Sequence, residues 1–178
     1  HQCVTSKTSA TAADLNAIDA KTTGIVNAAT VTGITSSTIA DVKTLLVTNV
    51  TTTTGLGAAT VALSDTSAVA TDLTAIDGAT SGVVTGASLT SISGTAAAVK
   101  AVMDVATDIV VGTELVNVTN AGVVLTAGSV TMADLKAVEA GTTGFVNASA
   151  ITAITAASAA DAELLLITNK GTSDDKIS

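Results

Sequence analysis

The chain has 178 residues, a formal net charge of −8, 47% hydrophobic residues and only 1% aromatic residues. All seven basic residues are Lys, against 15 acidic residues, so the sequence has little with which to bind phosphates and we expect no nucleic-acid binding. One His and one Cys are too few ligands for a zinc site. No apolar run approaches the roughly 20 residues of a membrane span, and the charged fraction of 12% is too low for a disordered acidic chain.

The scarcity of aromatic residues constrains the core. Phe145 is the single aromatic side chain, so Ala, Val, Ile and Leu have to fill the interior. Small side chains fill a core when the backbone layers lie close together, as they do in a thin solenoid in which each coil touches only its neighbours. The composition therefore favours a solenoid over a rounded domain.

An internal repeat runs along the chain. Residues 11–35 read TAADLNAIDAKTTGIVNAATVTGIT, and residues 69–93 and 131–155 align with them without a gap. A weaker unit follows each strong one: TIADVKTLL from Thr38, TAAAVKAVM from Thr95 and SAADAELLL from Ser158. The chain thus holds three double units, and we expect the longer connections, 47–58 and 105–122, to form one irregular edge.

Each unit predicts a short helix. A Thr or Ser three residues before an Asp is the spacing of a helix N-cap, in which the hydroxyl accepts a backbone N–H and the carboxylate reaches back. This spacing occurs in four units, at Thr11/Asp14, Thr38/Asp41, Thr131/Asp134 and Ser158/Asp161. It fails at Val69/Asp72 and at Thr95/Ala98, where we expect weaker helix starts.

Apolar residues three or four apart follow each cap, such as Leu15 and Ile18, and predict one buried stripe on a helix of about two turns. A glycine comes next in each strong unit, and we expect it to end the helix with a positive φ angle. These glycines are Gly24, Gly82 and Gly144. Two β-branched runs then predict strands, 24–28 and 31–35 in the first copy, with Val26 and Ala28 facing inward.

These elements predict a repeat protein, an α/β- or β-solenoid with stacked parallel strands and short helices. We expect an N-terminal extension at 1–8, one solenoid at 9–168 with double repeats at 9–65, 66–127 and 128–168, and a polar tail or connector at 169–178. A compact α/β globule with decayed internal symmetry is the alternative. The chain does not begin with Met and shows no signal peptide, so we expect a mature chain or a piece cut from a longer one.

The phrase T-x-x-D-L-x-A-I-D-x-x-T-T/S-G-x-V, followed by V-T-x-I-T, resembles tandem repeats of very large secreted or surface proteins of marine cyanobacteria and related bacteria. Its first part is also similar to segments of phage tail-fibre proteins. The resemblance covers residues 9–168 and implies an extracellular, structural or adhesive role without naming a catalytic residue. The glycine-aspartate nonapeptide of calcium-binding hemolysin repeats is absent, so no calcium site follows from it.

Two sets of repeated polar residues are candidate sites. The second acid of each strong unit could supply carboxylates to a calcium ion, although a solvated turn residue is the favoured interpretation; these acids are Asp19, Asp77 and Glu139. The threonines could form an ice-binding face, although Thr also suits an ordinary outward strand face. They are Thr32, Thr90 and Thr152, with Thr35, Ser93 and Thr155 three residues further on.

The function we predict from the sequence is that of an extracellular or cell-surface structural protein, in a surface layer, sheath, filament or adhesin. We expect it to act by self-association, since an exposed strand edge pairs with another chain unless it is capped. We expect no enzymatic activity. Cys3 lacks a partner within the chain and is a candidate for a cross-link between chains. The alternatives are a surface- or glycan-binding adhesion or phage-fibre module that uses the loops at 47–58 and 105–122, and, more remotely, an ice-binding solenoid.

Overall fold

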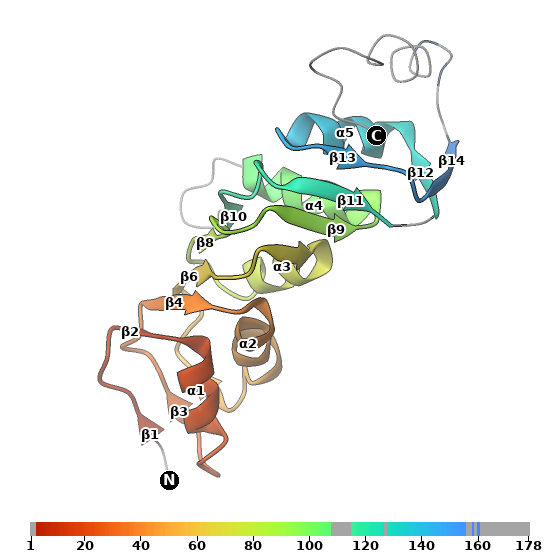
Figure 1. Ribbon diagram of the computed structural model, residues 1–178. Coiled ribbons are helices and arrows are strands. Elements are labelled where there is room, and N and C mark those ends of the chain that lie inside the picture. The colour runs from red at the N-terminus through yellow and green to blue at the C-terminus, as the bar shows by residue number, and fades with distance from the viewer. Residues whose placement is uncertain (1–2, 108–114, 127, 156–157, 159, 161–178) are drawn as a thin grey trace.

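The computed structural model describes residues 3–107, 115–126, 128–155, 158 and 160. In this part the chain is an elongated α/β fold of short parallel strands with helices along one side (Figure 1). The helices are α1 (Ala12–Asp19), α2 (Ile39–Lys43), α3 (Ala70–Asp77), α4 (Ala96–Thr107) and α5 (Met132–Gly141), and α2 continues into a π-helical turn, η1 (Thr44–Thr48). The predicted short helices and parallel strands are therefore present.

Hydroxyl groups at the helix starts explain why these segments are helical. Thr11, Thr38 and Thr131 each accept the backbone N–H three residues later at 3.1 Å, at the N-termini of α1, α2 and α5. In two of these caps the Thr hydroxyl also donates to the Asp carboxylate, at 2.7 Å to Asp41 and 2.8 Å to Asp134. The fourth predicted pair, Ser158/Asp161, cannot be followed because Asp161 lies outside the described residues.

The two helix starts predicted to be weaker differ from one another. Val69 makes no side-chain cap at α3, as expected. At α4 the prediction was wrong in part, because the Thr95 hydroxyl accepts the N–H of Ala98 at 3.2 Å. A cap needs only the hydroxyl, and the carboxylate that Ala98 lacks is an addition to it.

The strands fall into six layers. Each of layers 1 to 5 consists of one helix and the strands directly before it, and layer 6 consists of strands alone in the described chain. Layer 1 holds β1 (Cys3–Val4) and β2 (Ser9–Ala10) before α1, and layer 2 holds β3 (Val26–Asn27) and β4 (Gly33–Ser37) before α2. Layer 3 holds β5 (Thr53–Thr54), β6 (Thr60–Leu63) and β7 (Ser67–Val69) before α3, and layer 4 holds β8 (Val84–Thr85) and β9 (Ser91–Gly94) before α4. Layer 5 holds β10 (Leu115–Val116), β11 (Gly122–Leu125) and β12 (Gly128–Thr131) before α5; β13 (Val146–Asn147) and β14 (Ile151–Thr155) form layer 6.

Strands of adjacent layers pair in parallel, with a sideways step at layers 3 and 5. The first two strands of layer 3, β5 and β6, pair with layer 2, whereas its last two, β6 and β7, pair with layer 4. Layer 5 repeats this arrangement with β10, β11 and β12. The strands consequently form four sheets, in the orders β1-β3-β5, β10-β8-β6-β4-β2, β13-β11-β9-β7 and β12-β14. Strands at the same sequence position therefore do not form one uninterrupted rank, because each third strand displaces the ladder.

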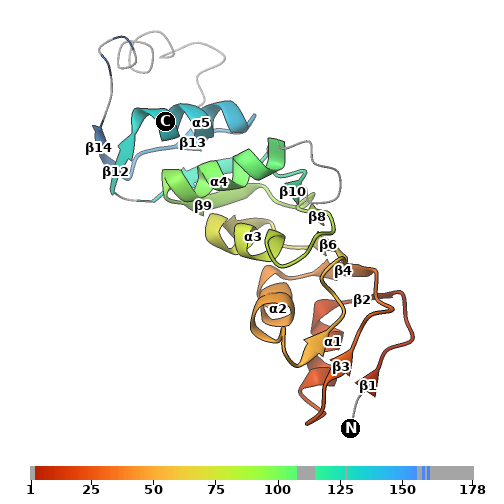
Figure 2. The ribbon, with the colours of Figure 1, turned by 180° about the vertical axis from the view of Figure 1, so that it is seen from behind.

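The core is aliphatic and runs through every layer of the described chain. Leu15, Leu73 and Leu135, the first apolar residues of the three strong helices, are buried in the same cluster. Val26 and Ala28 are buried as the alternation predicted. Phe145, in contrast, is 75% exposed, so the single aromatic side chain takes no part in the core. Consecutive helices contact one another from α1 to α5, which closes this core on the helical side (Figure 2).

The three glycines do not act as predicted. The helices end earlier, at Asp19, Asp77 and Gly141, and among the described glycines positive φ occurs only at Gly55 and Gly128. At Gly144 an added Cβ would lie 2.6 Å from the Ala121 carbonyl oxygen of the preceding layer, and one at Gly82 would overlap the carbonyl group of Ala59. These two glycines are needed for close backbone approach between layers.

The two segments predicted to form one irregular edge, 47–58 and 105–122, contain helix and strand residues. Residues 47–58 contain the end of η1 and all of β5, and both Thr53 and Leu56 are buried. Residues 105–122 contain the end of α4 and all of β10, with 108–114 outside the described residues. The insertions thus lengthen helices and add strands.

Candidate functional site at the N-terminal end

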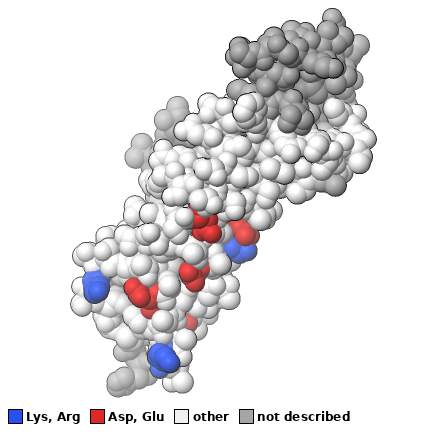
Figure 3. All heavy atoms as spheres, in the orientation of Figure 1, with Lys and Arg blue, Asp and Glu red and all other residues white. Residues whose placement is uncertain are grey.

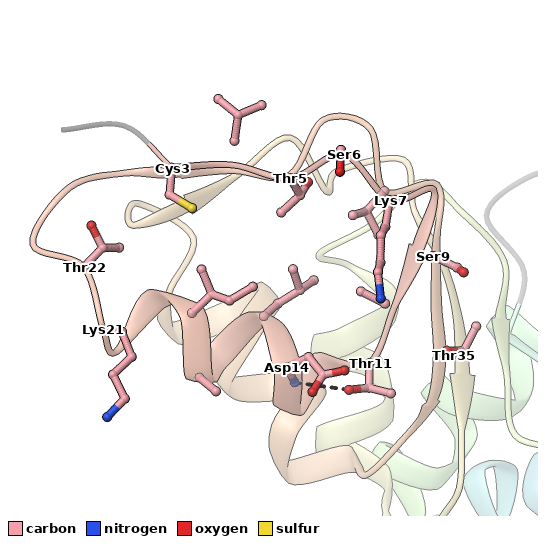
Figure 4. Close-up of a pocket in the computed structure, with 16 residues that line it drawn as sticks. Cys3, Thr5, Ser6, Lys7, Ser9, Thr11, Asp14, Lys21, Thr22 and Thr35 are labelled. Carbon is pink, nitrogen blue, oxygen red and sulfur yellow. Dashed lines mark hydrogen bonds between the residues drawn. The ribbon is translucent and has the colours of Figure 1, made fainter.

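A hollow of about 1090 Å³ opens at the N-terminal end of the molecule, between α1 and the chain that carries β1 and β2 (Figure 4). Its lining combines apolar and polar side chains, among them Val4, Leu15, Ile18, Thr11 and Asp14. The Cys3 thiol and the Lys7 side chain point into it from the β1–β2 segment.

The hollow exists because one side of α1 has no helical neighbour. The equivalent side of α3 is packed against α2 and η1, and that of α5 is packed against α4. The exposure of one aligned position shows the effect: Ile76 in α3 and Val138 in α5 are 0% exposed, whereas Ile18 in α1 is 37% exposed. The predicted apolar stripe is therefore fully buried in two of its three copies, and in α1 it ends at the hollow.

One threonine makes the same pair of hydrogen bonds between adjacent layers at two aligned positions, Thr80 and Thr142. Thr80 donates to the Ala59 carbonyl at 2.7 Å while accepting from the Gly82 N–H at 3.0 Å. Thr142 makes the same two bonds, to the Ala121 carbonyl at 2.8 Å and from the Gly144 N–H at 2.9 Å. We call this pair of bonds the layer clasp. The layer clasp joins a backbone carbonyl of one layer to the residues just before the first strand of the next layer.

Between layers 1 and 2, only half of the layer clasp lies within the described residues. The Thr22 hydroxyl accepts from the Gly24 N–H at 3.0 Å, as its equivalents do. The residue equivalent to Ala59 and Ala121 is His1, which lies outside the described residues, and Thr22 borders the hollow. Within the described residues, layer 1 therefore presents a strand edge without a strand partner and a helix side without a helical neighbour at the same end of the molecule.

Two further connections between layers were missed in the sequence. The Ser37 hydroxyl, in layer 2, accepts the N–H of Ala12 at 2.8 Å, and the Asp65 carboxylate, in layer 3, accepts the N–H of Ile39 at 2.7 Å. Each residue supplies a second cap to the helix of the layer before it. No local sequence pattern predicts these two bonds, because the donor and acceptor are about 25 residues apart.

The predicted threonine ranks use their hydroxyls within the ladder. Thr32 donates to the Thr8 carbonyl at 3.2 Å, Thr90 to Thr66 at 3.0 Å and Thr152 to Gly128 at 3.3 Å. In the second rank, Ser93 donates to Ala68 and Thr155 to Val130, each at 3.3 Å. These hydroxyl donors are engaged with the carbonyls of the neighbouring layer, so they bind layer to layer.

The predicted calcium candidates are not brought together. The Asp19 carboxylate accepts from Thr52 at 3.0 Å and from Thr53 at 3.2 Å, whereas Glu139 is half-buried on α5. Burial raises the pKa of the Asp77 carboxyl, and its buried Oδ1 has no hydrogen-bond partner among the described groups. Within the described ranges, no three His, Cys, Asp or Glu side chains lie close enough to hold a metal ion.

Charged side chains are few on the surface. On the face drawn in Figure 3 they lie over the N-terminal part of the molecule, and the described surface nearer the other end shows none. Lys43 in α2 pairs with Asp72 in α3 at 2.6 Å, beside a groove of about 500 Å³, and Lys100 pairs with Asp104 within α4 at 2.6 Å. The first of these ion pairs joins two layers.

Comparisons with family models, known proteins and solved structures found no match for this chain. The resemblance to tandem repeats of large bacterial surface proteins therefore stays a prediction. Among the residues that the structure describes, no helix has both the length and the apolar character needed to cross a membrane.

Proposed function

We propose that the chain is a solenoid repeat protein with a structural role outside the cell, which acts by stacking on further copies of itself. The observation that carries the proposal is that the same parallel pairing recurs from layer to layer. Residues 23 or 24 apart pair in every step from an odd to an even layer, such as Cys3 with Val26, Val61 with Val84 and Val123 with Val146. A ladder built this way has no intrinsic end.

The exposed ends supply the driving force in this proposal. β1 and β14 each pair with one strand, so within the described residues each has one edge of N–H and C=O groups without a strand partner. The hollow beside α1 adds uncovered apolar side chains at the same end. Stacking a second copy there would satisfy both kinds of group at once.

The extracellular location rests on the resemblance described above and on the acidic, Arg-free composition. The contacts within the ladder favour structural stacking over the ice-binding alternative, because the threonine hydroxyls donate to backbone carbonyls. They also favour it over a loop-based adhesion module, because part of the segment 47–58 is buried. No catalytic role is proposed.

Electron microscopy of the purified full chain across a range of concentrations tests this function. We expect short rods at low concentration and longer filaments or arrays, of unchanged width, at high concentration. Sedimentation velocity should show the matching rise in mass. Monodisperse short rods at the highest soluble concentration would contradict self-stacking and leave the adhesion module as the better hypothesis.

A further inference from the structure

We infer that copies join head to tail through one defined strand pair: β14 of one copy lies parallel to β1 of the next, with Ile154 opposite Cys3. This inference rests on the proposed self-stacking and adds the surfaces and the register. It follows from a pairing that the chain already makes twice within itself.

The internal precedents are the steps from layer 2 to layer 3 and from layer 4 to layer 5. β4 pairs with β6 with Ile34 opposite Val61, and β9 pairs with β11 with Ile92 opposite Val123. In both cases the second strand of an even layer meets the middle strand of the next odd layer. Both pairs are parallel and central to the core.

The alignment of the copies identifies Ile154 as the equivalent of Ile34 and Ile92. Ile34, Ile92 and Ile154 occupy the same position in the ungapped alignment of 11–35, 69–93 and 131–155. Their partners in the preceding layer agree, since they pair with Ala10, Ala68 and Val130, respectively. β14 therefore stands where β4 and β9 stand.

Cys3 is likewise the equivalent of Val61 and Val123, the partners of Ile34 and Ile92. Val61 pairs onward with Val84 and Val123 pairs onward with Val146, and Cys3 pairs onward with Val26. Val26, Val84 and Val146 are again one aligned position. β1 is therefore the equivalent of β6 and β11.

β1 and β14 have fewer strand neighbours than their equivalents inside the chain, and Ile154 in β14 is more exposed than its equivalents. β4, β6, β9 and β11 each have two strand neighbours, whereas β1 pairs only with β3, and β14 only with β12, among the described strands. Ile34 is 1% exposed and Ile92 is 0% exposed, but Ile154 is 39% exposed. In the head-to-tail contact, β1 of the next copy would lie against Ile154, as β6 lies against Ile34 and β11 against Ile92.

A chain cannot make this pair with itself, because β1 and β14 lie at opposite ends of the molecule in both views (Figures 1 and 2). A second copy carries both of these edges and is the occupant that we propose. Because the two edges differ, the contact is head to tail, which builds a filament unless the rotation between copies closes a ring.

Disulfide trapping tests the register. Facing residues in neighbouring parallel strands lie about 4.8 Å apart, which suits the Cα–Cα separation of a disulfide. A full-length chain carrying Cys3→Ser and Ile154→Cys is mixed with the native chain, which has only Cys3, in a glutathione redox buffer. The matched control carries Cys3→Ser and Ala150→Cys, since Ala150 is exposed in the turn before β14.

We expect the 3–154 disulfide to form at least about tenfold faster than the 3–150 disulfide, because pairing holds its two sulfur atoms within reach. A second pair in the same register, Val4→Cys with Thr155→Cys in chains that both carry Cys3→Ser, should behave alike and guards against misfolding of the first variant. Peptide mass spectrometry identifies the bonds.

Equal rates for positions 154 and 150, or a product dominated by Cys3–Cys3 disulfides, would overturn the register. If filaments are still seen by microscopy, self-stacking stands and only the strand pair is wrong. If neither filaments nor selective cross-links form, both the proposed function and this inference fail.

Discussion

The layer clasp allows the strength of the connection between layers to be measured with one substitution at two equivalent sites. Thr80→Val keeps the shape of the side chain but removes both of its hydrogen bonds. The Ala59 carbonyl and the Gly82 N–H are buried there and have no other hydrogen bond in the described chain. Thr22→Val is the matched control, because among the described residues Thr22 makes only the local bond to Gly24.

The magnitude follows from the groups left without partners. An unsatisfied buried backbone group costs about 1–3 kcal/mol, so Thr80→Val should lower the free energy of unfolding by about 2–5 kcal/mol. Thr22→Val loses one bond in a half-buried site, and we expect a loss of about 1 kcal/mol or less. Thr80→Ser keeps the hydroxyl and should restore most of the stability.

Urea unfolding followed by far-UV circular dichroism is the suitable assay, because the chain has neither Trp nor Tyr for fluorescence. The two valine variants should differ in midpoint at an unchanged slope. Equal losses at Thr80 and Thr22 would refute the reasoning, since the hydroxyl would then stabilise only its own turn and not the preceding layer.

Three further predictions use the same assay. Gly144→Ala places a Cβ against the Ala121 carbonyl and should cost about 3 kcal/mol, whereas Gly57→Ala, with no atom within 4 Å of the added Cβ, should cost under about 1 kcal/mol; similar losses would argue against close backbone approach. Burial raises the pKa of Asp77 above 3.8, so the folded state holds a proton that the unfolded chain releases, and stability should fall as the pH rises through that window; Asp77→Asn should remove this part of the slope, and an unchanged slope would contradict it. Lys43→Met breaks a partly exposed ion pair between α2 and α3 and should cost under about 1 kcal/mol, decreasing with salt; a larger, salt-independent loss would indicate packing by the Lys stem.

The helices were predictable because their signals are local. The hydroxyl at Thr11 and the apolar residue at Leu15 lie within one turn of the helix they define, so spacing alone locates the N-terminus. The inward alternation at Val26 is local in the same way. These elements were confirmed at nearly the residues expected.

The sideways step at layers 3 and 5 was not predicted, because it depends on pairing between residues more than 20 positions apart. The sequence did contain a trace of it: the second connection is longer than the first in each double unit. That length was interpreted as an irregular edge at 47–58 and 105–122, but these segments include the strands β5 and β10. Without the pairing, an added strand and an added loop look alike.

The glycine interpretation failed for a related reason. A glycine after a helix commonly adopts positive φ, and the local pattern at Gly82 fits that rule. What selects glycine there is the Ala59 carbonyl, which lies 23 residues earlier in the chain and reaches it only through the stacking of layers. The hollow beside α1 was missed in the same way, since it depends on how helices of different layers pack.

Hydrogen exchange of the native full chain as a function of concentration tests most directly whether the ladder continues from one copy to the next. Backbone amides of β1 and β14 should gain protection as the concentration rises, by about tenfold or more, while those of β9 stay protected throughout. The two terminal strands should change together, because each covers the other in the head-to-tail contact. Fast exchange in β1 and β14 at every concentration, in particles that nevertheless grow in mass, would contradict the strand pairing on which the rest depends.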